Sequence, residues 1–201
     1  MNKWLIGLAV AAVSLTAPVH SADMEAGKTT ASTICVACHM ADGNSVNPIW
    51  PKLAGQHESY IVKQLSEFKA GVRKDPTMMG MAAALSDQDM ANVAAYYTAQ
   101  KVNVGEAAAD KVAKGELIYR GGVAEKGIPA CTACHGPTGA GVSTSGFPAV
   151  GGQHAAYIEK QLNDFASDTR NNDANRMMRD IAHKMNAEEM AAVAQYMQGL
   201  H

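Results

Sequence analysis

Apolar residues recur at helical spacing near the end of each half of the chain. They share one helix face in each half, at Met90, Val93, Ala94 and Tyr97, and at Met190, Val193, Ala194 and Met197. A capping-box pattern precedes each stretch, with Ser86 and Asp89 before the first and Asn186 and Glu189 before the second. The strict alternation of apolar and polar residues that is typical of half-buried strands is absent. The pattern therefore predicts an all-α protein.

The two halves of the chain repeat one sequence pattern. Residues 51–57 (PKLAGQH) correspond to residues 148–154 (PAVGGQH), and residues 60–65 (YIVKQL) correspond to residues 157–162 (YIEKQL). A repeat that covers each half is typical of a duplicated domain. We therefore expect two similar domains in tandem.

The repeat also predicts where the domains begin and end. Domain 1 is expected at residues 23–100, a linker at 101–110 and domain 2 at 111–201, with extra residues near 120–129 in the second copy. Besides the last helix of each copy, helices are expected at residues 27–34, 60–68, 111–119 and 157–165.

Residues 1–22 have the pattern of a signal peptide. Lys3 precedes an apolar run at residues 5–17 that is too short to span a bilayer comfortably, and the small residues Ser21 and Ala22 follow. We expect cleavage after residue 21 or 22 and export to the periplasm, with an uncleaved membrane anchor as the alternative. The formal net charge of -2 argues against a surface that binds nucleic acid.

All four cysteines lie in two Cys-x-x-Cys-His motifs, which end at His39 and His135. This motif is the attachment site of c-type haem: the two thiols form thioethers, and the His is the proximal iron ligand. The motifs predict two covalently bound haem c groups, with thioethers at Cys35, Cys38, Cys131 and Cys134. A redox dithiol would need a βαβ context, which the sequence lacks, and a four-Cys zinc site would leave both His residues without a role. Two disulfides are the third alternative, but a bridge across two residues is strained and usually redox-active.

The iron ligand opposite each His must come from an equivalent pair in the repeat. His57 with His154, Met78 with Met178, and Met90 with Met190 are the candidate pairs. The last pair lies on an apolar helix face, where Met commonly fills a core. Met78 and Met178 are expected in the loop before that helix, where a sulfur can approach the iron. We favour this pair, although each member has a neighbouring Met that could ligate after a shift of one residue.

The order of these motifs resembles class I cytochrome c, and the duplication with Gly-Gln-His-x-x-Tyr-Ile in each half resembles the di-haem cytochrome c4 family. The resemblance covers residues 23–201. It implies two class I cytochrome c domains related by a pseudo-two-fold axis, haems near their interface, and axial ligation by His39 with Met78 and His135 with Met178. It also implies that the carbonyls of Pro51 and Pro148 accept the second ring N–H of each His.

The two halves differ at two of these repeat positions, and at one of them the first half also departs from the family pattern. Met40 follows the first motif where Gly is common and where Gly136 stands in the second half, and Leu85 differs from Met185. These differences could make the two haem potentials unequal. Three arginines are candidates to neutralise the charges of the haem propionates: Arg73, Arg170 and Arg176. The alternative is that these arginines are exposed to solvent.

The resemblance implies an electron carrier rather than an enzyme. Its expected donor is a quinol-oxidising bc-type complex and its expected acceptor is a haem-copper terminal oxidase. The protein is expected to be a monomer, and peripheral association with the membrane is compatible with the sequence. A di-haem peroxidase, a sulfur-oxidising dehydrogenase or a gas sensor would need an open iron position, whereas both halves offer the same Met. A tightly bound subunit of a larger reductase is a further alternative.

Overall fold

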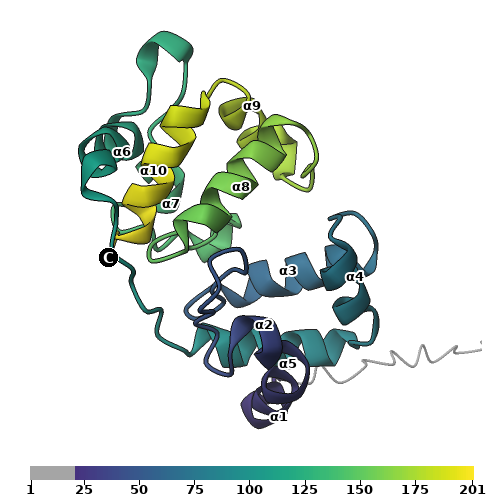
Figure 1. Cartoon of the computed structure of the whole chain (residues 1–201). Helices are drawn as coiled ribbons and strands as arrows, with labels where there is room; N and C mark the ends of the chain where they lie inside the picture. The colour runs from purple at the N-terminus through teal and green to yellow at the C-terminus, as the bar shows by residue number, and fades with distance from the viewer. Residues whose placement is uncertain (1–20) are drawn as a thin grey trace, which may run out of the picture.

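The computed structural model describes residues 21–201, which fold into two helical domains that lie against each other (Figure 1). Residues 1–20, with most of the predicted signal peptide, lie outside the described residues. Within residues 21–201 there is no β-strand, only the isolated bridges Val123–Ile128 and Val142–Phe147. The prediction of an all-α protein is confirmed. No helix in this part of the chain is long and apolar enough to cross a membrane.

The first domain begins with a helix that runs into the first Cys motif. This helix is α1 (Met24–Thr30), which continues through a π-helical turn (Ala31–Cys35) into α2 (Val36–His39). The remaining helices are α3 (Glu58–Lys69), α4 (Pro76–Ala83) and α5 (Asp87–Thr98).

The second domain repeats this order. Its α-helices are α6 (Ala109–Gly121), α7 (Thr132–His135), α8 (Ala155–Ala166), α9 (Met177–Ala182) and α10 (Ala187–Gln198). Short 3₁₀ turns lie at Ala124–Lys126, Ser143–Ser145 and Ala174–Arg176. The capping boxes predicted at the starts of α5 and α10 are both present.

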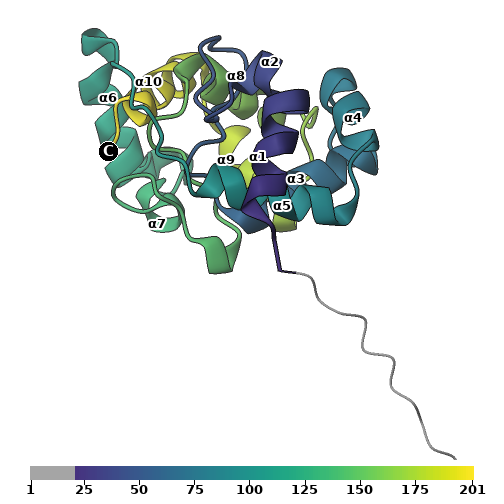
Figure 2. The same ribbon diagram turned by 90° about the horizontal axis from the view of Figure 1, so that it is seen from below.

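The first and last helices of each domain cross at a glycine. Figure 2 shows α1 beside α5, where a Cβ on Gly27 would lie 2.0 Å from the carbonyl oxygen of Asn92. At the equivalent crossing of α6 and α10, a Cβ on Gly115 would lie 2.2 Å from the carbonyl oxygen of Ala192. Only glycine permits this approach, because any side chain would push the helices apart. The crossings fix the frame on which the Cys motifs are held.

Each domain has one tyrosine among its fully buried side chains, but the two tyrosines come from different helices. Tyr97 of α5 is 1 % exposed beside Ala31, whereas Tyr119 of α6 is 0 % exposed and Met197 occupies the position equivalent to Tyr97. The hydroxyl of Tyr119 donates to the carbonyl of Gly136 at 2.6 Å. The large aromatic side chain therefore comes from the last helix of the first domain and from the first helix of the second domain.

Residues 99–108 connect the domains without a helix and are hydrogen-bonded to both of them. On the first domain, the Asn44 side chain donates to the Lys101 carbonyl at 3.0 Å and accepts from the Asn103 N–H at 2.8 Å. On the second domain, the Gly105 N–H donates to the carbonyl of Gln198 at 3.2 Å. The linker is thus attached at both ends rather than free.

Candidate haem-attachment sites

The two Cys-x-x-Cys-His motifs each form one turn of helix, in α2 and α7. All four cysteines are half-buried, and none of them forms a disulfide with another. Burial raises the pKa of Cys35, and it raises the pKa of Cys131 to about 11. In each motif the two half-buried thiols flank a single helical turn, the spacing that attachment to two vinyl groups of one haem requires. Among residues 21–201, no three His, Cys, Asp or Glu side chains come together as a metal-ion cluster.

The His residue of each motif is buried and held by one hydrogen bond. The Nδ1–H of His39 donates to the carbonyl of Pro51 at 2.8 Å, and that of His135 donates to the carbonyl of Pro148 at 2.9 Å. Burial lowers the pKa of both imidazoles, although the carbonyl bonds act in the opposite direction. The carbonyl acceptor holds the proton on Nδ1, so Nε2 is left available as the ligand atom.

Met78 and Met178 lie on short helices rather than in loops, so that part of the prediction is wrong. Pro76 is the first residue of α4, and the Asp75 carboxylate caps this helix by accepting from the Met78 N–H at 2.9 Å, which places Met78 in the first turn. Both methionines are half-buried, and Met178 packs against the core of the second domain. Their positions remain equivalent in the two domains.

The competing ligands differ from this pair in exposure. Met79 and Met177, the neighbours that a shift of one residue would bring in, are 36 % and 39 % exposed. Met90 is fully buried in the core, and Met190 is 3 % exposed, as expected for residues that fill a core. His154 caps the start of α8, and its Nε2 contacts the Ser45 carbonyl at 2.8 Å. These observations favour Met78 and Met178 over the neighbouring methionines, over Met90 and Met190, and over His154.

Two arginines meet at the interface between the domains, one from each. The Arg73 guanidinium stacks over Phe68 of its own domain at 4.6 Å and donates to the hydroxyl of Tyr157 in the other domain at 3.0 Å. The equivalent Arg170 stacks over Phe165 at 4.5 Å and donates to the hydroxyl of Tyr60 in the first domain at 2.8 Å. The reciprocal bonds show the pseudo-two-fold relationship directly.

These two cations bind only neutral groups in the part of the chain that the structure describes. Their other acceptors are the amide oxygens of Gln64, Gln161 and Asn172. Neither forms an ion pair with a carboxylate of residues 21–201, although a buried charge is normally paired. Carboxylates of a bound group, such as haem propionates, would fit this pair. The alternative that these arginines are solvated is wrong for Arg170, which is 8 % exposed, but holds for Arg176, which is exposed on its side chain.

Two glutamines also cross the interface. The Gln56 side chain donates to the carbonyl of Ala149 at 2.9 Å and accepts from the Ala149 N–H at 3.0 Å. Gln153 makes the same pair of bonds to Lys52, at 2.9 and 2.8 Å. Sequence analysis identified these residues only as members of the repeat, and their identity in both halves was the available signal of a role.

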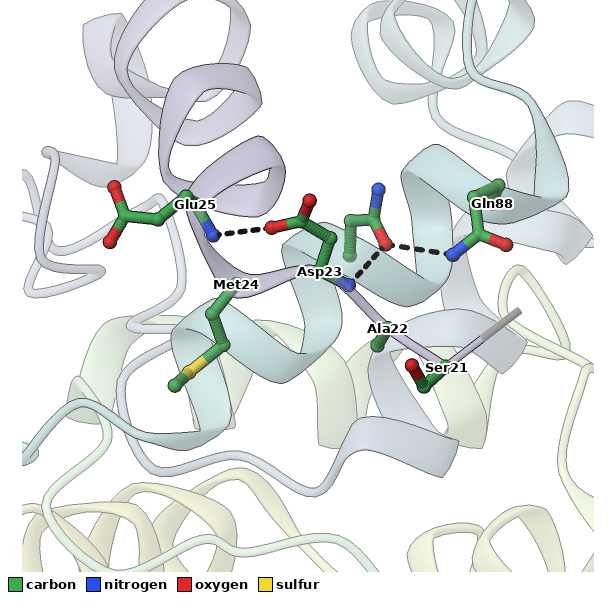
Figure 3. Close-up of a pocket in the computed structure, with 7 residues that line it drawn as sticks. Ser21, Ala22, Asp23, Met24, Glu25 and Gln88 are labelled. Carbon is green, nitrogen blue, oxygen red and sulfur yellow. Dashed lines mark hydrogen bonds between the residues drawn. The ribbon is translucent and has the colours of Figure 1, made fainter.

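A surface hollow near the start of the described chain is separate from these sites (Figure 3). In it, the Asp23 N–H donates to the Asn92 side chain at 2.8 Å, and Gln88 donates to the same oxygen at 2.8 Å. None of the residues of the Cys motifs lines this hollow.

Comparison with known proteins agrees with this geometry. The Cytochrome c family matches residues 24–98 and 112–201. Cytochrome c4 of Pseudomonas aeruginosa is 48 % identical over the whole of both chains. The crystal structure of reduced recombinant cytochrome c4 from Pseudomonas stutzeri superposes with a TM-score of 0.87 at 46 % identity, covering 90 % of this chain and all of that one. A thiosulfate dehydrogenase electron acceptor of Stutzerimonas stutzeri is 40 % identical, over 93 % of this chain and 90 % of its own length.

Two helical domains with a Cys-x-x-Cys-His turn in each define a di-haem c-type cytochrome. The protein belongs to the cytochrome c4 family. Its cofactors are two covalently bound haem c groups, one in each domain, and it is an electron carrier rather than an enzyme.

Proposed function

We propose that the protein carries electrons in a periplasmic respiratory chain, from a quinol-oxidising bc-type complex toward a haem-copper terminal oxidase. The observation that carries this proposal is the equivalence of the two sites. Each domain holds a buried imidazole that donates from Nδ1 to a proline carbonyl beside a Cys pair, and each offers an equivalent half-buried Met. Two irons that each have both axial positions filled would favour transfer of electrons over binding of a substrate.

In this proposal Cys35, Cys38, Cys131 and Cys134 form the haem thioethers. The axial ligands are His39 with Met78 and His135 with Met178. Bound haem supplies reversible one-electron chemistry, and the chain orients the imidazoles, presents the Met sulfurs and excludes water. A thioether ligand stabilises ferrous iron and so raises the potential of each site. Arg73 and Arg170 would pair with propionates at the interface, where they lack carboxylate partners among the described residues.

We further propose domain boundaries at residues 23–100 and 111–201, with residues 101–110 as the linker. Cleavage of a signal peptide after residue 21 or 22 would preserve the start of the first domain. The Asp23 carboxylate caps α1 by accepting from the backbone N–H groups of Glu25 and Ala26, so these residues belong to the folded unit. We expect the mature protein to be a monomer that can associate peripherally with the membrane.

A second candidate function is acceptance of electrons from a sulfur-oxidising enzyme. The observation that favours it is the 40 % identity to the thiosulfate dehydrogenase electron acceptor of Stutzerimonas stutzeri. The two functions use the same haem sites and differ only in the donor. They are distinguished by the protein that reduces the chain.

The proposed site is tested by absorption spectra of the mature protein in the oxidised and reduced states. We expect two haems per chain and a near-infrared band of Met-ligated ferric haem at full intensity for both. Met78→Ala and Met178→Ala should each remove half of this band, whereas the controls Met79→Ala and Met177→Ala should leave it unchanged. Loss of the band in a control variant would instead identify the substituted residue, Met79 or Met177, as the ligand.

The donor is tested by mixing the oxidised protein with a purified bc-type complex and quinol, or with a thiosulfate-oxidising dehydrogenase and thiosulfate. We expect faster reduction by the bc-type complex. Faster reduction by the dehydrogenase would favour the second candidate. A high-spin haem in the wild-type protein would contradict both, because it would indicate an open iron position.

A further inference from the structure

Gln56 and Gln153 each bond, in the opposite domain, the peptide group that follows the proline whose carbonyl accepts from the motif His. Oε1 of Gln56 accepts from the N–H of Ala149 at 3.0 Å. That N–H belongs to the peptide that joins Pro148 to Ala149. The carbonyl of the same peptide accepts from Nδ1 of His135 at 2.9 Å. A single peptide group therefore connects Gln56 of the first domain with the imidazole of the second.

The reverse connection is built from the equivalent residues. Oε1 of Gln153 accepts from the N–H of Lys52 at 2.8 Å, and the carbonyl of the same peptide, on Pro51, accepts from Nδ1 of His39 at 2.8 Å. In both domains the glutamine amide also donates to the next carbonyl along the chain, which holds its oxygen in place. The two chains of hydrogen bonds thus cross the interface in opposite directions.

Hydrogen bonds that share a peptide group polarise one another, by about 10–30 % per bond in condensed phases. An acceptor on the peptide N–H makes the carbonyl oxygen more negative. A more negative carbonyl draws the Nδ1 proton more strongly and makes the imidazole a stronger electron donor through Nε2. Gln56 is buried, at 8 % exposure, where such polarisation is little screened.

We propose that Gln56 and Gln153 are positioning residues, each of which sets the redox potential of the haem site in the opposite domain through this shared peptide group. The inference rests on the proposed assignment of His39 and His135 as iron ligands. A glutamine that only joined the domains could bond any exposed backbone group. Both instead bond the peptide that orients the opposite imidazole.

The test is a measurement of both haem potentials in the holoprotein of the variants Gln56→Met and Gln153→Met, which keep the side-chain length and remove the bonds. Gln56→Met should raise the potential of the second domain and leave that of the first near its wild-type value. Gln153→Met should do the reverse. The expected size is roughly a two- to tenfold change in the Fe(II)/Fe(III) ratio of the affected site at a fixed applied potential, as for loss of one hydrogen bond. Each variant is the matched control for the other.

A second variant covers the case in which the Met variants fold poorly. Gln56→Glu is nearly isosteric and retains an oxygen that accepts from Ala149, so the potential of the second domain should return to the wild-type value or fall below it. The Nδ1–H resonance of His135 should shift with this potential across the variants, and that of His39 should not. The proposal is overturned if Gln56 variants move the two potentials equally, move only that of the first domain, or move neither.

These outcomes are distinct from failure of the proposed function. If the wild-type protein lacks two His/Met-ligated haems, the ligand assignment fails before any variant is compared. If the wild-type protein has them and the potentials show no crossed response, only the role of the glutamines fails.

Discussion

Arg170 of the second domain donates to the hydroxyl of Tyr60 in the first domain at 2.8 Å, across the interface between the two domains. The phenol is buried, which by itself would raise the pKa of Tyr60. The guanidinium groups of Arg170 and Arg73 outweigh this effect and hold the pKa of Tyr60 below its ordinary value. The interface therefore carries positive charge that is stabilised by phenols as well as amides.

Arg170→Met should raise the pKa of Tyr60, because the nearest positive charge is removed from a buried phenol. It should also lower the free energy of unfolding by about 1–3 kcal/mol, since the Tyr60 hydroxyl and the Asn172 amide lose a buried donor. The pKa is measured by NMR of protein labelled at the tyrosine ring, and the stability by denaturant unfolding. Arg176→Met, at an exposed side chain, is the control and should change neither quantity.

Met40→Gly should stabilise the first domain. Met40 has φ 59° and ψ 164°, a conformation adopted almost solely by glycine, and the equivalent Gly136 has φ 76° and ψ 167°. Relief of this strain should contribute about 1–3 kcal/mol to the free energy of unfolding. The converse variant Gly136→Ala should destabilise the second domain through the backbone alone, because a Cβ there meets no atom within 4 Å. Equal stability of Met40→Gly and wild type in denaturant would contradict this explanation.

Ala31→Tyr and Tyr97→Met should compensate each other. Ala31 is 0 % exposed, so a tyrosine there alone overpacks the core and should cost about 1–3 kcal/mol. Tyr97→Met alone removes a buried ring and the contact of its hydroxyl with the Met40 carbonyl at 3.4 Å. The double variant reproduces the arrangement of Tyr119 and Met197, and a double-mutant cycle should give a favourable coupling of about 1 kcal/mol or more. Additive losses would show that the two cores are not interchangeable.

Acidification should release Met178 before it unfolds the protein. Burial by itself raises the pKa of Asp173, but hydrogen bonds from the backbone N–H and guanidinium of Arg179 outweigh it and leave this pKa below its ordinary value. The stabilisation is therefore complete above the unfolded pKa of about 3.9 and is lost as the pH falls through the folded pKa. Because Asp173 holds α9 at its start, we expect the near-infrared Met band of the second domain to decline in this pH window.

Two variants isolate this effect. Asp173→Asn retains a neutral acceptor and should remove this step from the pH dependence of the band. Asp110→Asn changes a carboxylate that is 77 % exposed and should leave the pH profile as in the wild type. Persistence of the step in Asp173→Asn would assign it to another group.

The sequence predicted the elements whose signals are local. The helices α5 and α10 carry an apolar face and a capping box, and both are confirmed. The helix α4 was missed, although Asp75 followed by Pro76 is a pattern typical of a helix start, because the segment is short and has no clear apolar face. The repeat predicted that the domains are similar. It did not predict that the fully buried tyrosine lies on the last helix of the first domain, at Tyr97, but on the first helix of the second domain, at Tyr119.

Contacts between the domains could not be predicted in the same way. Tyr60, Gln64 and Arg170 have polar side chains, and the sequence alone places such residues at a solvated surface. Their burial depends on which face of one domain meets the other, and neither repeat contains that information by itself. The same reason explains why Gln56 and Gln153 were recognised as repeated residues without a stated role.

The linker that is bound to Asn44 on one domain and to Gln198 on the other has a kinetic consequence. Together with the crossed glutamine bonds, these contacts favour one fixed arrangement of the domains over motion about a flexible tether. Electron exchange between the two haems would then occur by tunnelling across a fixed distance, at a rate insensitive to solvent viscosity, and an electron that enters through either domain would be available at both surfaces.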